Sequence, residues 1–363
     1  MCIQKLLFPK VLVSSIALGF MLSCSVDPFV DITPNGSGVA LEHADLLTQT
    51  DKKELLQHVQ KNTYYDAVTV IKDGKLLLNY GDYQLPMNCA SARKSIFSML
   101  YGIAIDKGLV DIDRSLEYYG IDDSKQPLTA AERKATIRQL LQARSGIYVK
   151  ALGESEGMKR RKPQRGAYLP GEHFYYNNFD FNVLPIILEK LTAKKLGDLI
   201  YEWLAVPTGM MYFKPEHVQY EYANYTDFPQ TRVYMNSEDL ARLGMLMVQN
   251  GSWAGQQLIS PAWVNVSTTA VSIAPNDKDL EGFVCQGYAY LWWVDLEANT
   301  FWANGAYGQF MIVDRDNNLV LVLRNNSGLN PIGIVENVLK NEYEDEASAK
   351  ELYEMLITKI QLK

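Results

Sequence analysis

Ser91 and Lys94 are the residues of this 363-residue sequence whose types and spacing could do chemistry. Ser91 is the only serine with a lysine three residues downstream. The apolar stretch from Ser95 to Ile105 predicts a helix, which would place Ser91 in its first turn. Residues three apart share a helix face, and helical side chains lean toward the N-terminus, so the lysine amine would point at the serine hydroxyl.

The chemistry that this pair favours is nucleophilic attack by the serine. A serine hydroxyl needs an adjacent base, and a lysine becomes one when burial or a nearby cation lowers its pKa. The unpaired N–H groups at the start of a helix also stabilise an oxygen that acquires negative charge. The alternative interpretation is an unreactive surface serine beside a lysine that only favours the helix.

A second group of polar and aromatic residues follows a tight turn at Pro170-Gly171, and it reads Glu172-His173-Phe174-Tyr175-Tyr176-Asn177-Asn178. The pattern Pro-Gly-x-x-Phe-x-Tyr-x-Asn, well downstream of a Ser-x-x-Lys that opens a helix, resembles the serine β-lactamase and penicillin-binding-protein superfamily. The resemblance is closest to its class C β-lactamase-like branch, which includes D,D-carboxypeptidases, carboxylesterases and 6-aminohexanoate-dimer hydrolases.

The resemblance implies roles for Tyr176 and Asn178, because both Tyr175-x-Asn177 and Tyr176-x-Asn178 fit the motif but the spacing from the Pro-Gly turn selects the second. In the family, this tyrosine exchanges protons with the serine and the leaving group, and the asparagine positions the substrate or the lysine. An unperturbed tyrosine has a pKa of about 10, so a nearby ammonium would have to lower that pKa for it to act as a base. A buried aromatic cluster beside a turn is the alternative.

The family's third motif is Lys-Thr-Gly or His-x-Gly on a strand beside the site, and here Ala303-Asn304-Gly305 takes its place. The cation is missing, which argues against classical β-lactamase or D,D-peptidase activity. Gly305 would allow close approach of the substrate. By resemblance, the N–H groups of Ser91 and Ala306 would form the oxyanion hole, and Asn304 would belong to the substrate-binding residues.

The elements that must position these residues predict an α+β, two-lobed protein. Strand pairs are expected over 67–71 and 76–78 near one end and over 310–313 and 319–323 near the other, so one antiparallel sheet would be built from both terminal segments. The resemblance implies the β-lactamase/transpeptidase-like fold, with flanking helices and a mainly helical lobe over roughly 110–235. Further predicted elements are helices over 51–62, 183–196 with an interruption near Pro185, 237–247 and 343–360, a capping box at 129–132 that opens a helix, and a strand over 288–294.

The first 23 residues predict a lipoprotein signal peptide. Two lysines precede the apolar run 11–22, and Met21-Leu22-Ser23-Cys24 resembles a bacterial lipobox, with Cys24 as the lipidated residue. Ordinary cleavage or a retained anchor is the alternative, because methionine is not the preferred residue at the first box position. Residues 24–50 would be a tether, and 51–363 a single hydrolase domain. We expect an envelope protein that faces the periplasm, favouring the outer membrane.

Composition narrows the possible partners. The net charge is −7, and the basic run 159–162 is interpreted as a solvated loop, so nucleic-acid binding is not expected. Histidines are scattered and no metal motif is present, so no metal or other cofactor is expected. Cys89 and Cys285 are interpreted as buried free thiols, although an oxidising compartment would permit a disulfide.

The leading hypothesis is a serine hydrolase that uses neither a metal nor another cofactor, cleaves a small-molecule ester, amide or peptide through an acyl-enzyme, and acts as a monomer. A penicillin-binding protein, D,D-carboxypeptidase or β-lactamase is the nearest alternative. The third hypothesis is a non-catalytic binding module on the same scaffold.

Overall fold

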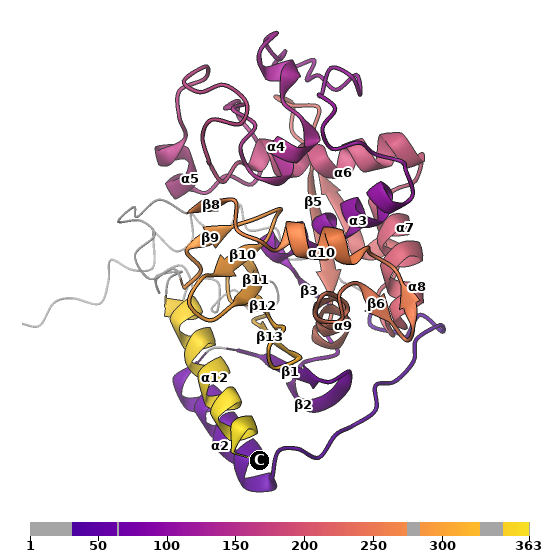
Figure 1. Ribbon diagram of the computed structural model, residues 1–363, viewed down its shortest axis with the longest axis vertical. Helices are drawn as coiled ribbons and strands as arrows, with labels where there is room; N and C mark the ends of the chain where they lie inside the picture. Colours follow the sequence, from indigo (N-terminus) through magenta and orange to yellow (C-terminus); the bar gives the residue numbers. More distant parts are fainter. Residues whose placement is uncertain (1–30, 64, 274–283, 327–343, 363) are drawn as a thin grey trace, which may run out of the picture.

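An eight-stranded antiparallel sheet joins the two ends of the chain (Figure 1). The computed structural model describes residues 31–63, 65–273, 284–326 and 344–362. Within these ranges the strand order is β2-β1-β13-β12-β11-β10-β9-β8, and β1 pairs with β13. The predicted sheet from both terminal segments is therefore confirmed. Its strands are β1 (Ala67–Lys72), β2 (Lys75–Gly81), β8 (Ser272–Ile273), β9 (Gly287–Tyr288), β10 (Trp293–Asp295), β11 (Thr300–Gly305), β12 (Gln309–Asp314) and β13 (Leu319–Arg324).

Helices cover both faces of this sheet. On one face α9 (Ser237–Val248) packs closely enough that a Cβ on Gly244 would lie 2.6 Å from Val320 of β13. On the other face α12 (Glu344–Gln361) lies beside α2 (Gln49–Asn62), as Figure 1 shows. Successive strand residues point to opposite faces, so each strand of the sheet supplies both packing layers.

The second lobe is mainly helical and lies above the sheet in Figure 1. Its α-helices are α4 (Ile137–Leu141), α5 (Glu156–Arg161), α6 (Asn178–Thr192), α7 (Leu196–Ile200) and α8 (Val206–Thr208), with a π-helical turn over Tyr201–Ala205. A small sheet of β3 (Met87–Asn88), β5 (Gln230–Met235) and β4 (Val218–Glu221) accompanies them. Between the lobes runs α3 (Arg93–Asp106), which contacts α6 on one side and β11 on the other. The remaining elements are α10 (Pro261–Ser267) and the hairpin of β6 (Ser252–Trp253) and β7 (Gln256–Gln257).

Three predicted elements differ from the structure. Helix α6 begins at Asn178, because the Asn177 side chain caps it by accepting from the backbone N–H of Phe179, and it continues through Pro185 to Thr192. The predicted strand over 288–294 is two strands, β9 and β10, separated by a turn in which Leu291 has a φ of 66°.

The capping box at Thr129 and Glu132 forms as predicted but opens only a 3-10 turn. The helix itself starts at Ile137, behind a second capping box in which the Thr136 side chain accepts from the N–H of Gln139.

The segment before α2 is not a free tether over residues 31–48. Asn35 donates its amide hydrogens to the carbonyls of Met210 and Phe213, at 2.9 and 3.1 Å. The Val39 N–H donates to the Gly209 carbonyl at 3.0 Å. We call residues 31–39 the N-terminal strap, and the tether prediction is wrong for it. The predicted signal peptide and Cys24 lie outside the described residues. Among the described helices, none combines the length and the hydropathy needed to cross a bilayer.

Candidate active site

Ser91 lies in a strained turn at the N-terminus of α3. The turn is a 3-10 helix over Ala90–Ala92, and Ala90 has a φ of 43°, which is left-handed for a residue that carries a Cβ. Such a conformation costs about 1–3 kcal/mol and persists where its surroundings enforce it. Asn88 accepts from the Ala90 N–H at 2.9 Å, and Arg93 donates to the Ala90 carbonyl at 2.5 Å. The serine is thus presented by a turn that its neighbours hold from both sides.

Lys94 is the hub of the site. Its Nζ lies 3.0 Å from Ser91 Oγ, 2.6 Å from the Tyr176 hydroxyl and 3.3 Å from Asn178 Oδ1. The lysine side chain is buried, and its Nζ also lies 4.3 Å from the centre of the Phe181 ring. The structure therefore brings together the four residues that the two motifs indicated.

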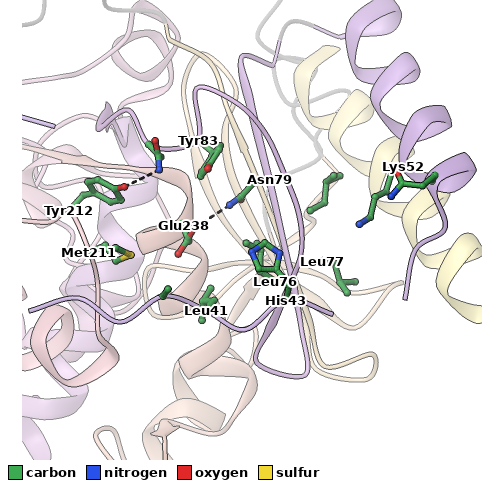
Figure 2. Close-up of a pocket in the computed structure, with 14 residues that line it drawn as sticks. Leu41, His43, Lys52, Leu76, Leu77, Asn79, Tyr83, Met211, Tyr212 and Glu238 are labelled. Atoms are coloured by element: carbon green, nitrogen blue, oxygen red, sulfur yellow. Dashed lines mark hydrogen bonds between the residues drawn. The ribbon is translucent and has the colours of Figure 1, made fainter. Parts of the chain in front are cut away.

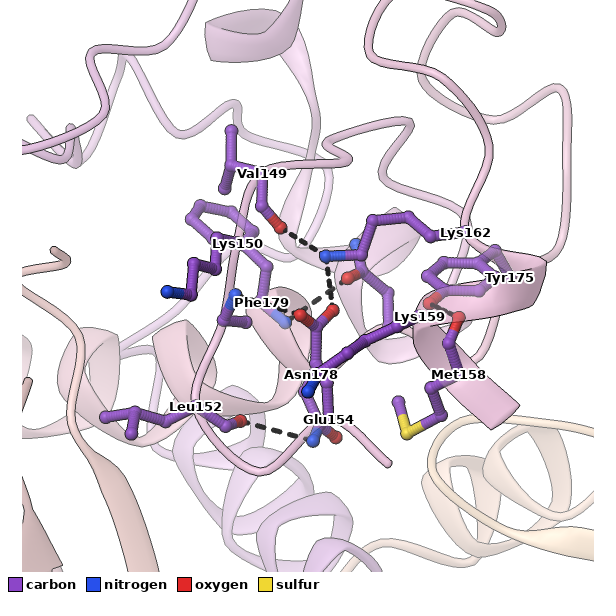
Figure 3. Close-up of polar contacts among 12 residues, drawn as sticks. Val149, Lys150, Leu152, Glu154, Met158, Lys159, Lys162, Tyr175, Asn178 and Phe179 are labelled. Carbon is purple, nitrogen blue, oxygen red and sulfur yellow. Dashed lines mark hydrogen bonds and ion pairs between the residues drawn. The ribbon is translucent and has the colours of Figure 1, made fainter. Parts of the chain in front are cut away.

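The amide of Asn178 has a defined orientation. Its Nδ2 donates to the Leu152 carbonyl at 3.2 Å, which leaves Oδ1 to accept from Lys94 (Figure 3). A neutral amine has two N–H bonds and one lone pair. Because Asn178 Oδ1 can only accept, one N–H is committed to it, and the lone pair is left for the hydroxyl of Ser91 or of Tyr176.

Burial shifts the pKa values of the two proton carriers in opposite directions. Burial, helped by the charge of Arg93, lowers the pKa of Lys94 well below its ordinary value of 10.5. Burial raises the pKa of Tyr176 to about 12, against the opposing effects of the Ser91 hydroxyl and of Arg93. Sequence reasoning expected an ammonium to lower the tyrosine pKa, whereas here the stronger effect is desolvation. The arrangement thus favours Lys94 as the base and Tyr176 as a protonated phenol.

Aromatic rings enclose Tyr176. Its ring centre lies 4.7 Å from that of Phe181, 5.4 Å from that of Trp293 and 5.9 Å from that of Tyr288. The neighbouring Tyr175 points elsewhere and donates to the Met158 carbonyl at 2.8 Å. The choice of Tyr176 over Tyr175 therefore agrees with the geometry. The aromatic cluster of the alternative interpretation is also present, because these rings surround Tyr176.

Gly305 at the end of β11 lies directly against the serine turn. A Cβ at this position would lie 2.5 Å from the Cys89 carbonyl oxygen and 3.0 Å from the Ala92 nitrogen. Its side of the strand is shared by Ala303, two residues earlier. No larger side chain fits at Gly305 without moving the turn. Ala306 follows in the exposed turn after β11.

Asn304 faces the other way. Its amide nitrogen donates to Glu346 of α12 at 2.9 Å, on the face of β11 opposite to Gly305. The structure therefore does not bring the Asn304 side chain to Ser91, and the prediction that this side chain contacts substrate is corrected. The reason is the two-residue period of the strand, since a glycine that faces the site forces the preceding residue to face away.

The loop between α4 and α6 is fastened beneath Lys94 by a buried ion pair that sequence reasoning missed. Lys162 pairs with Glu154, whose side chain is 3% exposed, and it donates to the Val149 carbonyl at 2.8 Å (Figure 3). Within this loop the Leu152 carbonyl accepts from both Asn178 and Asn182. The basic run 159–162 is thus more than a solvated loop, because its first three residues end α5 and Lys162 pairs with a carboxylate that is almost fully buried.

A separate cavity of about 420 Å³ lies along β2 (Figure 2). Residues from several segments line it, among them His43, Lys52, Asn79, Tyr212 and Glu238. Asn79 donates to Glu238 at 3.2 Å across its wall. Lys94 and the three residues around it, Ser91, Tyr176 and Asn178, are not part of its lining.

Cys89 and Cys285 are buried free thiols, as predicted. Over the described ranges, no three His, Cys, Asp or Glu side chains gather as a group that could hold a metal ion.

The chain matches one family model and is similar to several solved structures. A family model described as Beta-lactamase matches residues 53–341. No curated protein matches the sequence. A Bacillus anthracis protein assigned as a 6-aminohexanoate-dimer hydrolase is similar in structure, with a TM-score of 0.60 and 18% identity over 93% of this chain and 94% of that one.

Two further solved structures are similar. A penicillin-binding-protein homologue from Caulobacter crescentus has a TM-score of 0.58 and 12% identity, over 79% of this chain and 93% of that one. A family VIII carboxylesterase has a TM-score of 0.56 and 12% identity, over 84% of this chain and 98% of that one. At these identities the likeness is one of fold.

Proposed function

We propose that this chain, which belongs to the β-lactamase family and is a serine hydrolase, cleaves an ester or amide bond through an acyl-enzyme on Ser91. The observation that carries this proposal is the position of Lys94 Nζ, within hydrogen-bond distance of both the Ser91 and the Tyr176 hydroxyls. A buried amine so placed is the adjacent base that a serine nucleophile needs.

The reaction proceeds in two halves. In the first, Ser91 Oγ bonds to the substrate carbonyl carbon while its proton passes to Lys94. The bond to the leaving group then breaks, and the leaving group takes up a proton from the Lys94–Tyr176 pair. In the second half, water gives a proton to the same pair and attacks the acyl carbon. The Ser91 oxygen leaves and regains its proton, so the enzyme returns to its starting state.

Asn178 and the turn around Gly305 complete the proposed site. Asn178 holds one N–H of Lys94, which keeps the amine oriented toward the hydroxyls. The N–H groups of Ser91 and Ala306 would stabilise the oxyanion, which is typically a large contribution to the rate. The branch we propose is class C-like and nearer to esterases than to D,D-peptidases, because Ala303 stands where those peptidases carry a cation.

We also propose an envelope location on the N-terminal sequence alone. The apolar run 11–22 and the lipobox-like Met21-Leu22-Ser23-Cys24 support a lipid anchor on Cys24 and a domain that faces the periplasm. Globomycin treatment of expressing cells, followed by mass analysis of the protein, tests this. Accumulation of a precursor that retains residues 1–23 supports it, and unchanged processing contradicts it.

A fluorophosphonate probe tests the proposed nucleophile without a guess about the substrate. Intact mass and peptide mapping should find one adduct, on Ser91, and the Ser91→Ala variant should show none. Ser95→Ala is the matched control, because Ser95 lies one turn further along α3 and donates to the Leu291 carbonyl at 2.8 Å.

The same experiment separates the alternatives. Absence of an adduct on folded wild-type protein, or labelling that persists in Ser91→Ala, contradicts the hydrolase mechanism and favours the binding module. A stable adduct of penicillin on Ser91 instead favours a penicillin-binding protein.

A further inference from the structure

Three cross-strand neighbours lie on the face of the sheet that meets the serine turn. Gly305 of β11 pairs with Gln309 of β12, and Arg324 of β13 follows one step beyond the pair formed by Phe310 and Leu323. Gln309 is 1% exposed and Arg324 is 0% exposed. A glycine, an amide and a guanidinium thus form a buried row behind Ser91, and neither Gln309 nor Arg324 has a part in the proton transfers described above.

Arg324 fastens the segment that leads to the nucleophile. Its Nη2 donates to the Met87 carbonyl at 2.8 Å and lies 3.9 Å from the Cys89 sulfur. Its Nη1 donates to the Met235 carbonyl of β5 at 2.9 Å. Met87 and Cys89 lie four and two residues before Ser91, so the guanidinium fixes the chain as it enters the turn.

The acceptors of this guanidinium are all neutral. They are backbone carbonyls, a thiol and an amide oxygen. Burying a guanidinium costs free energy unless several hydrogen bonds compensate the lost hydration. Because the N–H groups of a guanidinium lie in a fixed plane, these hydrogen bonds hold their acceptors at defined positions.

Gln309 fastens the turn on the opposite side of the site. Its Oε1 accepts from Arg324 Nε at 2.6 Å. Its Nε2 donates to the Tyr307 carbonyl at 3.1 Å and to the Asn325 carbonyl at 2.5 Å. Tyr307 follows Ala306 and has a left-handed φ of 64°, so the amide holds a strained turn.

We propose that Arg324 and Gln309 are positioning residues that set the separation of the Ser91 and Ala306 N–H groups. The two N–H groups belong to segments far apart in sequence, and a continuous chain of hydrogen bonds joins them. It runs from the Met87 carbonyl through the guanidinium and the amide to the Tyr307 carbonyl. This inference rests on the proposed acyl-enzyme function.

The physical reason is the sensitivity of such a site to small displacements. Donors stabilise an oxyanion only when both lie within about 3 Å of the position that the oxygen will occupy. A misplacement of about 1 Å can cost on the order of 100-fold in rate. Gly305 allows the turn that carries Ser91 to lie against the end of β11, and the Arg324–Gln309 hydrogen bond fixes the position of this turn relative to the turn that carries Ala306.

The test uses two substitutions of Gln309, both of which remove its hydrogen bond to the Tyr307 carbonyl. Gln309→Glu keeps an acceptor for Arg324 but removes the donor to the Tyr307 carbonyl, and Gln309→Met removes both while leaving Arg324 charged. For each variant we would measure kcat/KM for p-nitrophenyl butyrate and the Kd of phenylboronic acid, whose tetrahedral adduct on serine resembles the oxyanion. Both variants should lose roughly 10- to 100-fold in kcat/KM and a similar factor in boronate affinity.

Gln257→Glu is the matched control. Gln257 also donates from its amide to two backbone carbonyls, those of Asn250 at 2.8 Å and Ile259 at 2.6 Å, in the exposed β6–β7 hairpin. It should keep wild-type kinetics. The pH midpoint of kcat/KM should stay unchanged in all three variants, because Lys94 is not touched.

Different results would contradict the positioning role and the proposed hydrolase function. The positioning role fails if folded Gln309 variants keep kcat/KM and boronate Kd within twofold of wild type. It also fails if only Gln309→Glu loses activity, because the effect is then that of charge. If Ser91→Ala hydrolyses the ester as fast as wild type, the proposed function itself fails.

Discussion

The Tyr176 hydroxyl lies 2.6 Å from Lys94 Nζ, and burial pushes the pKa values of the two groups apart. The lysine pKa falls and the tyrosine pKa rises to about 12, so the pair holds one proton on the phenol and a lone pair on the amine. An uncharged acid and an uncharged base in contact can each take part in proton transfer, and the site carries no buried net charge before the reaction begins.

The pH dependence of hydrolysis should follow Lys94. The amine must be neutral to accept the Ser91 proton, so kcat/KM should rise with pH and level off with a midpoint below 10.5. Tyr176 stays protonated through this range. Initial rates between pH 5 and 10 check the prediction, with stability monitored in parallel. A rise that continues with a midpoint at or above the ordinary lysine value would contradict it.

The stability of the protein should respond to the same group. Because the folded-state pKa of Lys94 lies below its unfolded value of 10.5, the unfolded chain binds more protons between those two values. The contribution of Lys94 to the free energy of unfolding therefore rises with pH across this window. Urea titrations at several pH values should show that the free energy of unfolding of wild type, minus that of Lys94→Met, increases as pH rises through this window. A constant difference would show that the lysine does not titrate on unfolding.

Removal of one hydroxyl should separate the two adjacent tyrosines. Tyr176→Phe removes a group that touches Lys94, and we expect kcat/KM to fall about 10²- to 10⁴-fold. Tyr175→Phe removes only the hydrogen bond to the Met158 carbonyl, which should cost about 1 kcal/mol of stability and leave turnover near wild type. Ester hydrolysis and thermal unfolding of both variants check this, and similar activity in the two would refute the assignment of Tyr176.

The buried ion pair in the loop beneath the site should matter for stability. Lys162→Met leaves the Glu154 carboxylate buried without its partner, and we expect a loss of about 3 kcal/mol in the free energy of unfolding. Glu154→Gln added to Lys162→Met should recover part of this loss. Lys159→Met is the control, because its pair with Glu156 is exposed and should leave stability unchanged. Urea denaturation measures all three, and equal effects of the two lysine substitutions would contradict the buried role.

A single methyl group on Gly305 should disturb the serine turn. The added Cβ would lie 2.5 Å from the Cys89 carbonyl, so Gly305→Ala should cost about 1–3 kcal/mol and at least 100-fold in kcat/KM. Gly157→Ala is a suitable control, since a Cβ there would lie 3.5 Å from its nearest neighbour, the Arg161 side chain. Unfolding curves and ester hydrolysis compare the two, and wild-type turnover in Gly305→Ala would show that the turn adapts.

The sequence predicted the residues around Lys94 well because their signals are local or come from family spacing. Ser91 and Lys94 share a helix face, and the distance from the Pro-Gly turn selected Tyr176 over Tyr175. The direction of the Tyr176 pKa was wrong, because desolvation depends on rings of β9 and β10 that pack around it only in the folded chain.

Other parts of the site have no signature in the sequence. The Leu152 carbonyl that orients Asn178 is a backbone atom in an irregular loop, so its residue type carries no information. Arg324 ends an apolar strand and resembles an ordinary exposed charge at a strand end, until the strand order places it behind Cys89. The orientation of Asn304 was predictable only from the exact strand register, which fixes which residues face Ser91.

The N-terminal strap limits how far the domain could lie from a membrane that holds a lipid on Cys24. Asp31 pairs with Lys214, and its carbonyl lies 3.0 Å from the His217 ring, so the strap is fixed to the helical lobe from that residue onward. Asp31 lies seven positions after Cys24, and a fully extended chain of that length reaches about 25 Å. A lipid on Cys24 would therefore keep Asp31, and the lobe to which the strap is fixed, within about 25 Å of the bilayer surface.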